Sequence, residues 1–229
     1  MRPIARIHTD FPTKFGIPRQ SGIIASLQGR IVFEPEYRNA EAVRGLEEFS
    51  HIWLIWEFSE AVRADWSPTV RPPRLGGNVR KGVFATRSPF RPNPIGLSSV
   101  KLDKVEIDPN LGPVLHVSGA DLMDGTPIYD IKPYIAYTDS HPDAVSGFAS
   151  KPAEYLLDVD FPKDLLEKVP TDLYESLIEV LAHDPRPQYH NDPERVYGME
   201  FGGMEVKFKV DGTRLAVLQI AKSQDCDNQ

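Results

Sequence analysis

Seven cations lie close together between residues 63 and 91, and they mark the part of this sequence best suited to binding an anion. They are Arg63, Arg71, Arg74, Arg80, Lys81, Arg87 and Arg91, with Asp65 as the one acidic residue among them. Arginine predominates, and its planar guanidinium makes bidentate contacts with phosphate and stacks on aromatic faces. We call residues 63–91 the basic segment and interpret it as a surface for phosphates and bases. The alternative is an ordinary charged loop in solvent.

The basic segment and the residues that follow it are also rich in proline. Pro68, Pro72, Pro73, Pro89, Pro92 and Pro94 fall within 27 residues. Proline lacks an amide donor, so this stretch cannot form a helix interior or a central strand. Apolar residues at 83–85 and 95–97 indicate order, because disordered tracts lack such anchors. We therefore predict a long, ordered loop of the kind that is usually functional.

Familiar catalytic patterns are missing from the rest of the sequence. The phosphate-binding GxxxxGK[ST], dinucleotide-binding GxGxxG, zinc-binding HExxH and nucleophile GxSxG strings do not occur. The histidines are scattered without the spacing of metal ligands, so we expect no metal site, and we interpret His51 as structural. Cys226 is the single cysteine, which excludes a disulfide framework, and its place in a polar tail makes it a poor nucleophile.

Short strands predominate among the elements that must position the basic segment. Runs typical of strands occur at residues 4–7, 29–33, 51–58, 97–107, 115–117 and 126–131. The run 51–58 (HIWLIWEF) is so apolar that we predict a strand buried on both faces, and 97–107 alternates like a half-buried strand. A short helix is expected from its cap at Asn39 through Leu46. Since no βαβ rhythm appears, a parallel Rossmann sheet is not expected, and we predict a mainly β fold with a closed, barrel-like first domain.

The second half of the chain predicts a small α+β domain. Leu173, Leu177, Val180 and Leu181 have helical spacing after Thr171, and Asp184–Pro185 should end that helix. Gly202–Gly203 and Asp211–Gly212 are hairpin turn signals between three alternating runs, which predicts a meander. We place the first domain at residues 1–140, a linker at 141–162 and the second domain at 163–229.

The formal net charge of −7 is distributed unevenly between the predicted first domain and the rest of the chain. Residues 1–140 hold 17 basic and 16 acidic residues, for +1, whereas residues 141–229 hold 9 and 17, for −8. The total by itself argues against a nucleic-acid or membrane-surface protein, but the basic segment alone carries +6. The N-terminus lacks the apolar core of a signal peptide, and no apolar run approaches the roughly 18 residues of a membrane span. We therefore expect a soluble, cytoplasmic protein without a membrane partner.

Four strings of unusual composition indicate a protein family. They are FGIPRQ at 15–20, GLEEFSHIWLIWEF at 45–58, RPPRLGGN at 71–78 running into GVFATRSPFRPNPIGLS at 82–98, and DLMDGTPIYDIKPY at 121–134. In this order they resemble the TsaA-like family, whose characterised members are the TrmO-type tRNA methyltransferases. DPRPQY at 184–189 and YGMEF at 197–201 resemble the C-terminal domain of its bacterial members.

The resemblance implies a reaction, a cofactor and an assembly. Family members transfer a methyl group from S-adenosylmethionine to N6 of the threonylcarbamoyl-modified adenosine immediately 3′ of the tRNA anticodon. Their catalytic domain is a β-barrel, and they form homodimers with the cofactor near the subunit interface. We therefore expect a homodimer that binds the anticodon loop of tRNA through the basic segment.

The resemblance also implies which residues bind the cofactor. Carried over to this sequence they are Pro18, Arg19, Gln20, Ser59, Glu60, Arg87, Leu97, Asp124, Gly125, Thr126 and Pro127. Gly125 and Pro127 would shape a turn that presents backbone groups to the ligand, although DGTP is also a plain β-turn sequence and Leu97 could be a core residue. Ser59 departs from the histidine usual in the family, so a backbone contact is what we expect there.

Methyl transfer requires alignment of the reacting atoms and loss of one proton from the acceptor nitrogen. The titratable candidates for this catalytic role are Asp124, Asp130 and Tyr134, among which the sequence does not choose, and Asp130 could instead pair with Lys132. The cations assigned to tRNA phosphates and bases are Arg71, Arg74, Arg80, Lys81 and Arg91.

The sequence is also compatible with two other functions. One is a module that binds cofactor or RNA and has lost catalysis, for which the serine at position 59 is the best support. The other is a methyltransferase that acts on a small molecule with the same fold.

Overall fold

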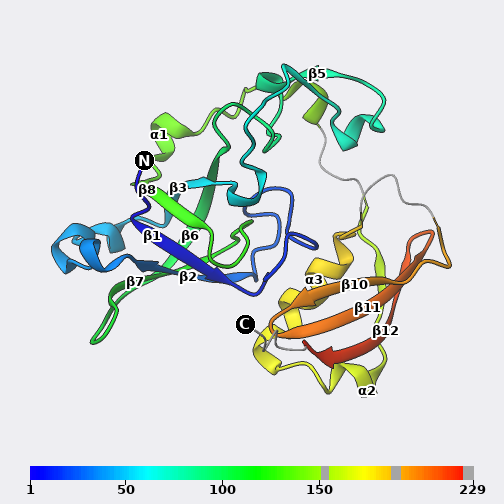
Figure 1. Cartoon of the computed structure of the whole chain (residues 1–229). Coiled ribbons are helices and arrows are strands. Elements are labelled where there is room, and N and C mark those ends of the chain that lie inside the picture. The colour runs from blue at the N-terminus through cyan, green and yellow to red at the C-terminus, as the bar shows by residue number, and fades with distance from the viewer. Residues whose placement is uncertain (151–154, 187–191, 224–229) are drawn as a thin grey trace.

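A closed barrel formed by the first half of the chain lies beside an open sheet formed by the second half (Figure 1). The computed structural model describes residues 1–150, 155–186 and 192–223. Cys226, His190 and the end of the DPRPQY string therefore lie outside the described residues.

The barrel confirms the predicted fold class. Its strands are β1 (Ala5–Thr9), β2 (Gln28–Phe33), β3 (His51–Glu57), β6 (Ile95–Asp108), β7 (Gly112–Ser118) and β8 (Pro127–Pro133). They are antiparallel in the order β1-β2-β7-β6-β3-β8, and β8 closes the ring on β1, where Ile128 pairs with Ala5. Side chains from alternating positions, such as Ile7, Ile31 and Leu115, fill the interior and are completely buried.

Strand β3 is buried on one face, so the prediction of burial on both faces was wrong. Ile52, Leu54 and Trp56 point into the barrel, whereas Trp53 and Ile55 on the outer face are half-buried. A barrel strand has one face in the core, and here the outer face is covered in part by the short helix α1 (Ala136–Asp139). Asp139 Oδ2 accepts a hydrogen bond of 2.9 Å from Trp53 Nε1, which ties α1 to the strand.

The helix expected from Asn39 through Leu46 is shorter than predicted. Asn39 caps it as expected, accepting from the amide of Glu41 at 3.0 Å, but the 3-10 helix η2 (Ala40–Val43) stops at Val43. Gly45 has a φ of 83°, a left-handed conformation that interrupts the helix before a second turn, η3 (Leu46–Glu48). A further 3-10 turn, η1, spans Pro35–Tyr37.

The basic segment is an ordered loop, as its prolines predict. It contains a minimal hairpin of β4 (Thr69–Val70) and β5 (Lys81–Gly82). Around this hairpin lie the 3-10 turns η4 (Ser59–Ala61), η5 (Pro73–Leu75) and η6 (Val83–Ala85). Val83 is buried and anchors the loop, and the loop extends beyond one end of the barrel (Figure 1).

The predicted meander is present in the second half, with one strand added. β10 (Tyr197–Phe201), β11 (Met204–Asp211) and β12 (Arg214–Lys222) follow one another, and β9 (Asp158–Asp160) joins parallel to β12. We call these four elements the C-terminal sheet. β9 lies within residues 141–162, so the segment predicted as a linker contributes to this sheet.

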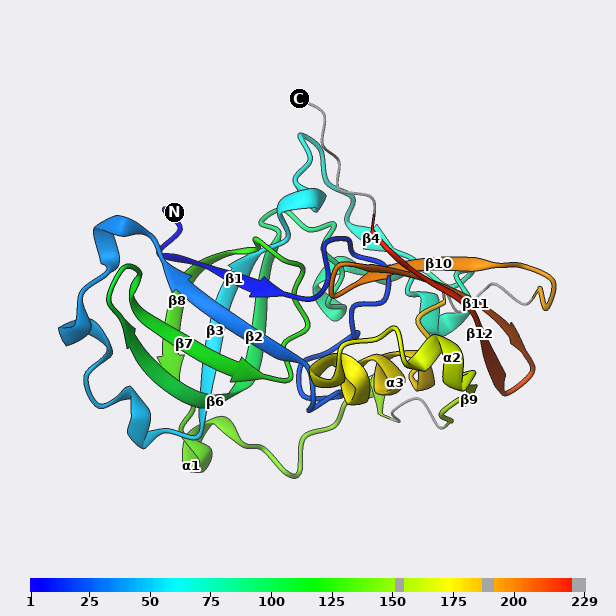
Figure 2. The same ribbon diagram turned by 90° about the horizontal axis from the view of Figure 1, so that it is seen from below.

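Helices α2 (Lys163–Leu166) and α3 (Tyr174–Ala182) pack on one face of the C-terminal sheet (Figures 1 and 2). The predicted helix begins at Thr171 as a 3-10 turn, η8 (Thr171–Leu173), which continues into α3. Leu177, Val180 and Leu181 are buried, as their spacing predicts. A last 3-10 turn, η7 (Gly147–Ala149), precedes β9.

The connection between β1 and β2, residues 10–27, joins the two halves. Phe11, Ile24 and Leu27 belong to the same buried cluster as the side chains of the C-terminal sheet. The carbonyl of Asp10 accepts a hydrogen bond of 2.8 Å from the amide of Gly202. The C-terminal half therefore holds this connection in place, and the connection reaches the site described next.

Candidate active site

A cavity of about 1130 Å³ opens where β3 ends and β6 begins. Its lining comes from four parts of the chain: the β1–β2 connection (14 and 17–21), β3 with the turn that follows it (53 and 56–61), the basic segment with the residues after it (63, 84, 87, 89–93 and 95–99), and the chain before β8 (121–123 and 126). Ligand pockets usually measure about 300–1000 Å³, so this space exceeds what one small ligand needs. It can take a cofactor together with part of a second molecule.

Trp56 and the start of β6 form the inner wall of the cavity. A Cβ atom on Gly96 would lie 2.2 Å from the Trp56 ring, so glycine is required at this position for the indole to lie against β6. The indole Nε1 donates a hydrogen bond of 3.0 Å to Ser98 Oγ, and the ring of Phe58 lies beside it with centroids 4.2 Å apart. The GLS part of the RPNPIGLS string thus supports an aromatic wall.

Asp121 continues this hydrogen-bond chain into the cavity. Ser98 Oγ donates to Asp121 Oδ1 at 2.6 Å, and the backbone amide of Ser21 also hydrogen-bonds this carboxylate. Burial raises the pKa of Asp121, while the Ser98 hydroxyl, the amides and the charge of Arg87 oppose that rise without cancelling it. Asp121 is therefore a carboxylate that binds a proton more readily than an exposed aspartate does.

Most of the predicted cofactor positions line the cavity. These are Pro18, Arg19, Gln20, Ser59, Glu60, Arg87, Leu97 and Thr126. Arg87 Nη1 donates to Gln20 Oε1, which joins the basic segment to the β1–β2 connection across the wall. Leu97 is 58% exposed, so it is not the core residue that the alternative interpretation made it.

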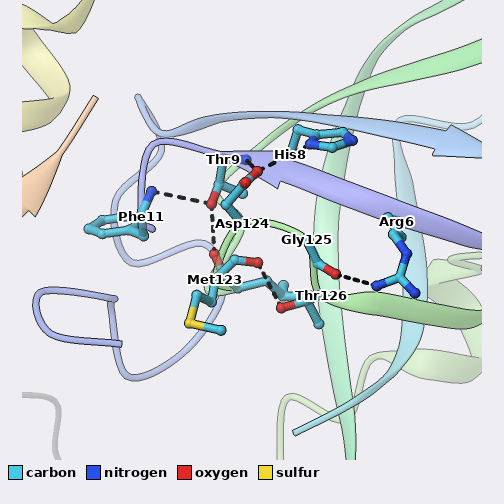
Figure 3. Close-up of polar contacts among 9 residues, drawn as sticks. Arg6, His8, Thr9, Phe11, Met123, Asp124, Gly125 and Thr126 are labelled. Carbon is cyan, nitrogen blue, oxygen red and sulfur yellow. Dashed lines mark hydrogen bonds and ion pairs between the residues drawn. The ribbon is translucent and has the colours of Figure 1, made fainter. Parts of the chain in front are cut away.

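Asp124, Gly125 and Pro127 lie outside the lining of this cavity. Gly125 adopts a φ of 74°, as the turn prediction requires, and the turn is bound to β1 (Figure 3). Asp124 Oδ1 accepts from the amide of Thr9 at 3.1 Å and contacts His8 Nδ1 at 3.2 Å, while the carbonyl of Gly125 accepts from Arg6 at 2.9 Å. These groups of the turn are engaged within the chain, and the turn places Thr126 at the cavity.

The predicted proton acceptors are not brought together at the cavity. Asp124 is held by β1, and Asp130 forms an ion pair of 2.9 Å with Lys132, the pairing that the structural alternative describes. The ring of Tyr134 packs beside Trp53, with centroids 5.5 Å apart, on the outer face of the barrel. Asp121 lies in the same string as these three residues, and sequence analysis did not select it. The sequence feature that could have identified Asp121 was its place in that string, three residues before Asp124.

Exposed aromatic rings and cations form the outer rim of the cavity. Phe84 is 71% exposed and lies 6.2 Å from the ring of Trp66, which is 52% exposed. The guanidinium of Arg63 stacks over Phe90 at 4.0 Å. Arg63 and Arg91 line the cavity, whereas Arg71, Arg74, Arg80 and Lys81 lie outside its lining on the hairpin side of the basic segment.

Comparison with known proteins decides the family. The model of the tRNA-methyltransferase O N-terminal domain matches residues 6–140, and that of the TrmO C-terminal domain matches residues 155–223. The chain belongs to the TrmO family. The resemblance found in the four strings is thereby confirmed, and it extends to the second half of the chain.

Relatives of this TrmO-family chain match it over most of its length. The tRNA (adenine(37)-N6)-methyltransferase of Escherichia coli is 42% identical, with 90% of this chain and 91% of the relative covered. A putative S-adenosylmethionine-dependent methyltransferase of Pseudomonas aeruginosa is 39% identical, with 89% of each covered. The crystal structure of TrmO from Pseudomonas aeruginosa matches with a TM-score of 0.75 at 32% identity, over 96% of this chain and 97% of that one.

Ser59 is the first residue of turn η4. The preceding residue, Phe58, donates its amide to the carbonyl of Pro94 at 2.8 Å, which fixes the backbone beside the cavity. The backbone groups of residues 59 and 60 are thus positioned at the wall whatever side chain position 59 carries.

Among the described residues, no group of three or more histidine, cysteine, aspartate or glutamate side chains is placed to hold a metal ion. Nor does this part of the chain contain a helix that combines the length and the apolar character needed to cross a membrane.

Proposed function

We propose that the protein is a tRNA methyltransferase that transfers a methyl group from S-adenosylmethionine to N6 of adenosine 37, next to the anticodon, when that adenosine carries a threonylcarbamoyl group. One observation carries the proposal. A single cavity is lined both by the residues that the family resemblance assigns to the cofactor and by the arginines and exposed aromatic rings of the basic segment. The names of the relatives agree with this function and do not favour a module without catalysis or a small-molecule methyltransferase.

The chemistry of the cavity fits S-adenosylmethionine. When bound, the cofactor supplies a methyl group on a positively charged sulfur. A site for it needs stacking surface, hydrogen-bonding groups and carboxylates near the positive charges. Trp56 and Phe58 provide aromatic surface, Glu57 and Glu60 provide carboxylates, and Gln20 with Arg87 provides polar side chains.

We assign cofactor binding to the predicted residues that line the cavity. These are Pro18, Arg19, Gln20, Ser59 through its backbone, Glu60, Arg87, Leu97 and Thr126. Asp124, Gly125 and Pro127 act indirectly, because their turn is bound to β1 and places Thr126 at the wall.

The rim of the cavity suits a single-stranded loop of RNA. Unpaired bases stack on aromatic side chains and on guanidinium planes, which are the groups that Phe84, Trp66 and the Arg63–Phe90 pair expose. Arg91 lies within the cavity lining and is suited to the target nucleotide itself. Arg71, Arg74, Arg80 and Lys81 lie farther out and are suited to phosphates of the flanking loop.

Assembly, domain division and location complete the proposal. We infer a homodimer, supported by exposed apolar side chains around the start of β6 and in α1, whose Tyr137 is 91% exposed.

The division into a cofactor-binding barrel and a small C-terminal domain is supported by the separate buried clusters of the two halves. Since tRNA modification requires access to tRNA, we place the enzyme in the cytoplasm.

Transfer of a labelled methyl group tests the proposed function. The enzyme is incubated with labelled S-adenosylmethionine and tRNA from a strain that lacks this activity, and the label is located by nuclease digestion. Incorporation on adenosine 37 is expected. Cofactor binding without incorporation would indicate a module that has lost catalysis, and incorporation only into small molecules would indicate the other alternative.

A further inference from the structure

Asp121 has a defined environment inside the cavity, and the roles assigned above leave its carboxylate without a task. It receives hydrogen bonds from Ser98 Oγ at 2.6 Å and from backbone amides, including that of Ser21. Ser98 is held in turn by Trp56 Nε1 at 3.0 Å. Three separate segments of the chain therefore orient one partly buried carboxylate toward the space that the substrates must share.

We propose that Asp121 accepts the proton of N6 when the target adenosine is methylated, with Ser98 and Trp56 as the residues that position it. This inference rests on the proposed function, because it names the proton acceptor for that reaction. It does not depend on which tRNA species are substrates.

The reaction requires such an acceptor. The lone pair of an adenosine N6 is delocalised into the purine, and in a threonylcarbamoyl-modified base also into the attached carbonyl, so N6 is a weak nucleophile while it keeps its hydrogen. As the N–CH₃ bond forms, the methyl–sulfur bond breaks and its electron pair stays on sulfur. The N6–H bond also breaks, its electron pair stays on nitrogen, and the proton passes to Asp121 Oδ. The charges balance, since the positive sulfonium and a carboxylate become a neutral thioether and a neutral carboxylic acid.

The other carboxylates of the cavity are less suited to this role. Glu57 Oε2 accepts a hydrogen bond of 2.7 Å from Tyr129 Oη. Glu60 lies on the solvent side, 3.9 Å from Lys14 Nζ, with more than half of its side chain exposed. Asp121 is mostly buried, and burial makes a carboxylate a stronger base because the charged form loses solvation.

The groups that face Asp121 define its expected titration. Arg87 is the charged neighbour, from the basic segment, and it favours the carboxylate form. Ser98 from β6 and the amide of Ser21 from the β1–β2 connection are neutral donors that act in the same direction. Burial outweighs them, so the pKa of Asp121 remains above that of an ordinary aspartate.

Asp121→Asn tests the proposal, because asparagine keeps the shape and the acceptor oxygen for Ser98 but cannot take the proton. We expect the single-turnover rate of methylation, at saturating cofactor and tRNA, to fall by about 10²- to 10⁴-fold, the usual contribution of general base catalysis. The dissociation constants of both ligands, measured by calorimetry and filter binding, should change by less than about threefold. Asp121→Glu should recover part of the rate.

The matched control is Asp103→Asn. Asp103 also accepts a hydrogen bond from a strand serine, Ser118, but it lies outside the lining of the cavity. The control should keep the wild-type rate. A similar loss of rate in the control would show that disturbing any such pair slows the enzyme, and the proposal would be wrong.

The pH dependence gives a second, independent test. The wild-type rate should fall as the pH drops through the pKa of Asp121, because the protonated carboxyl cannot accept a proton, and Asp121→Asn should lack this acid limb. Ser98→Ala removes a bond that lowers the pKa, so its acid limb should move to higher pH. Carbon-13 NMR of the carboxyl carbons in the free enzyme should show the same displacement without any turnover.

The outcomes separate this inference from the proposed function. If wild-type enzyme methylates adenosine 37 and Asp121→Asn does so within threefold of its rate, Asp121 is not the acceptor. If the variant instead loses cofactor affinity by the factor that it loses in rate, Asp121 holds the cofactor and the proposal is overturned. If the wild type does not methylate tRNA while the NMR titration behaves as described, the proposed function fails on its own.

Discussion

The indole of Trp56 occupies the space that a side chain at position 96 would fill, because a Cβ atom on Gly96 would lie 2.2 Å from the ring. This contact joins β3 to β6 and sets the position from which Trp56 donates to Ser98. The aromatic wall and the polar chain that ends at Asp121 therefore depend on one glycine.

Gly96→Ala should displace the Trp56 ring and destabilise the protein. Overpacking of a well-packed site costs about 1–3 kcal/mol, which urea unfolding followed by tryptophan fluorescence can measure. Gly82→Ala is the control, since a Cβ atom there meets nothing within 4 Å and the residue has a negative φ. Equal stability of the two variants would contradict the packing of Trp56 against β6.

Arg87→Ala and Arg74→Ala should affect different ligands. Arg87 lines the cavity beside Gln20, and loss of a charge-assisted hydrogen bond should weaken cofactor binding by about 10- to 100-fold. Arg74 lies outside the lining, so its loss should raise the KM for tRNA and reduce the slope of binding against salt by about one unit. Calorimetry with cofactor and filter binding at several salt concentrations distinguish them. Equal effects of both variants on both ligands would contradict this division.

Phe84→Ala should weaken tRNA binding without destabilising the fold. Phe84 is 71% exposed, so its removal opens no cavity, whereas loss of one stacked base costs about 1–3 kcal/mol. Phe84→Trp should keep the affinity. Ile107→Ala, at an apolar position that is 59% exposed and lies outside the cavity lining, is the control in the same filter-binding assay. A tRNA affinity unchanged by Phe84→Ala would show that the rim ring does not stack on RNA.

Asp10→Asn should increase the thermal stability at neutral pH. Burial raises the pKa of Asp10, and the nearby charges of Asp172 and Asp124 raise it further. A raised pKa in the folded state means that this group favours folding when protonated, and that this contribution is lost as the pH rises through the folded-state pKa. The melting temperature of Asp10→Asn should therefore exceed that of the wild type at pH 7, and the difference should shrink on acidification. A lower melting temperature at pH 7 would show that the charged carboxylate stabilises the junction.

Features that depend on neighbouring residues were predictable from the sequence. Alternation of apolar residues places strands β6 and β11, the Gly–Gly and Asp–Gly pairs place the hairpin turns, and proline excludes helix interiors and central strands from the basic segment. The degree of burial was less predictable. The HIWLIWEF run has the composition of a fully buried strand, but closure of the barrel leaves its outer face with only partial cover from α1.

The strings that resemble the family contain most of the residues that line the cavity. They did not distinguish Asp121 from Asp124, which lie three residues apart in one string. The direction of the chain before β8 decides the difference, since Asp121 faces Ser98 and Arg87 while Asp124 faces the amide of Thr9.

By itself the sequence determined the mainly β fold, the family and a basic segment concealed within a net charge of −7. Composition, local periodicity and strings of residues carry that information without reference to distant contacts. Only the tertiary structure decided which carboxylate is partly buried at the cavity and which cations line it. Burial and proximity arise when segments near residues 20, 56, 87, 98 and 121 meet in space, and no pattern along the chain encodes those distances.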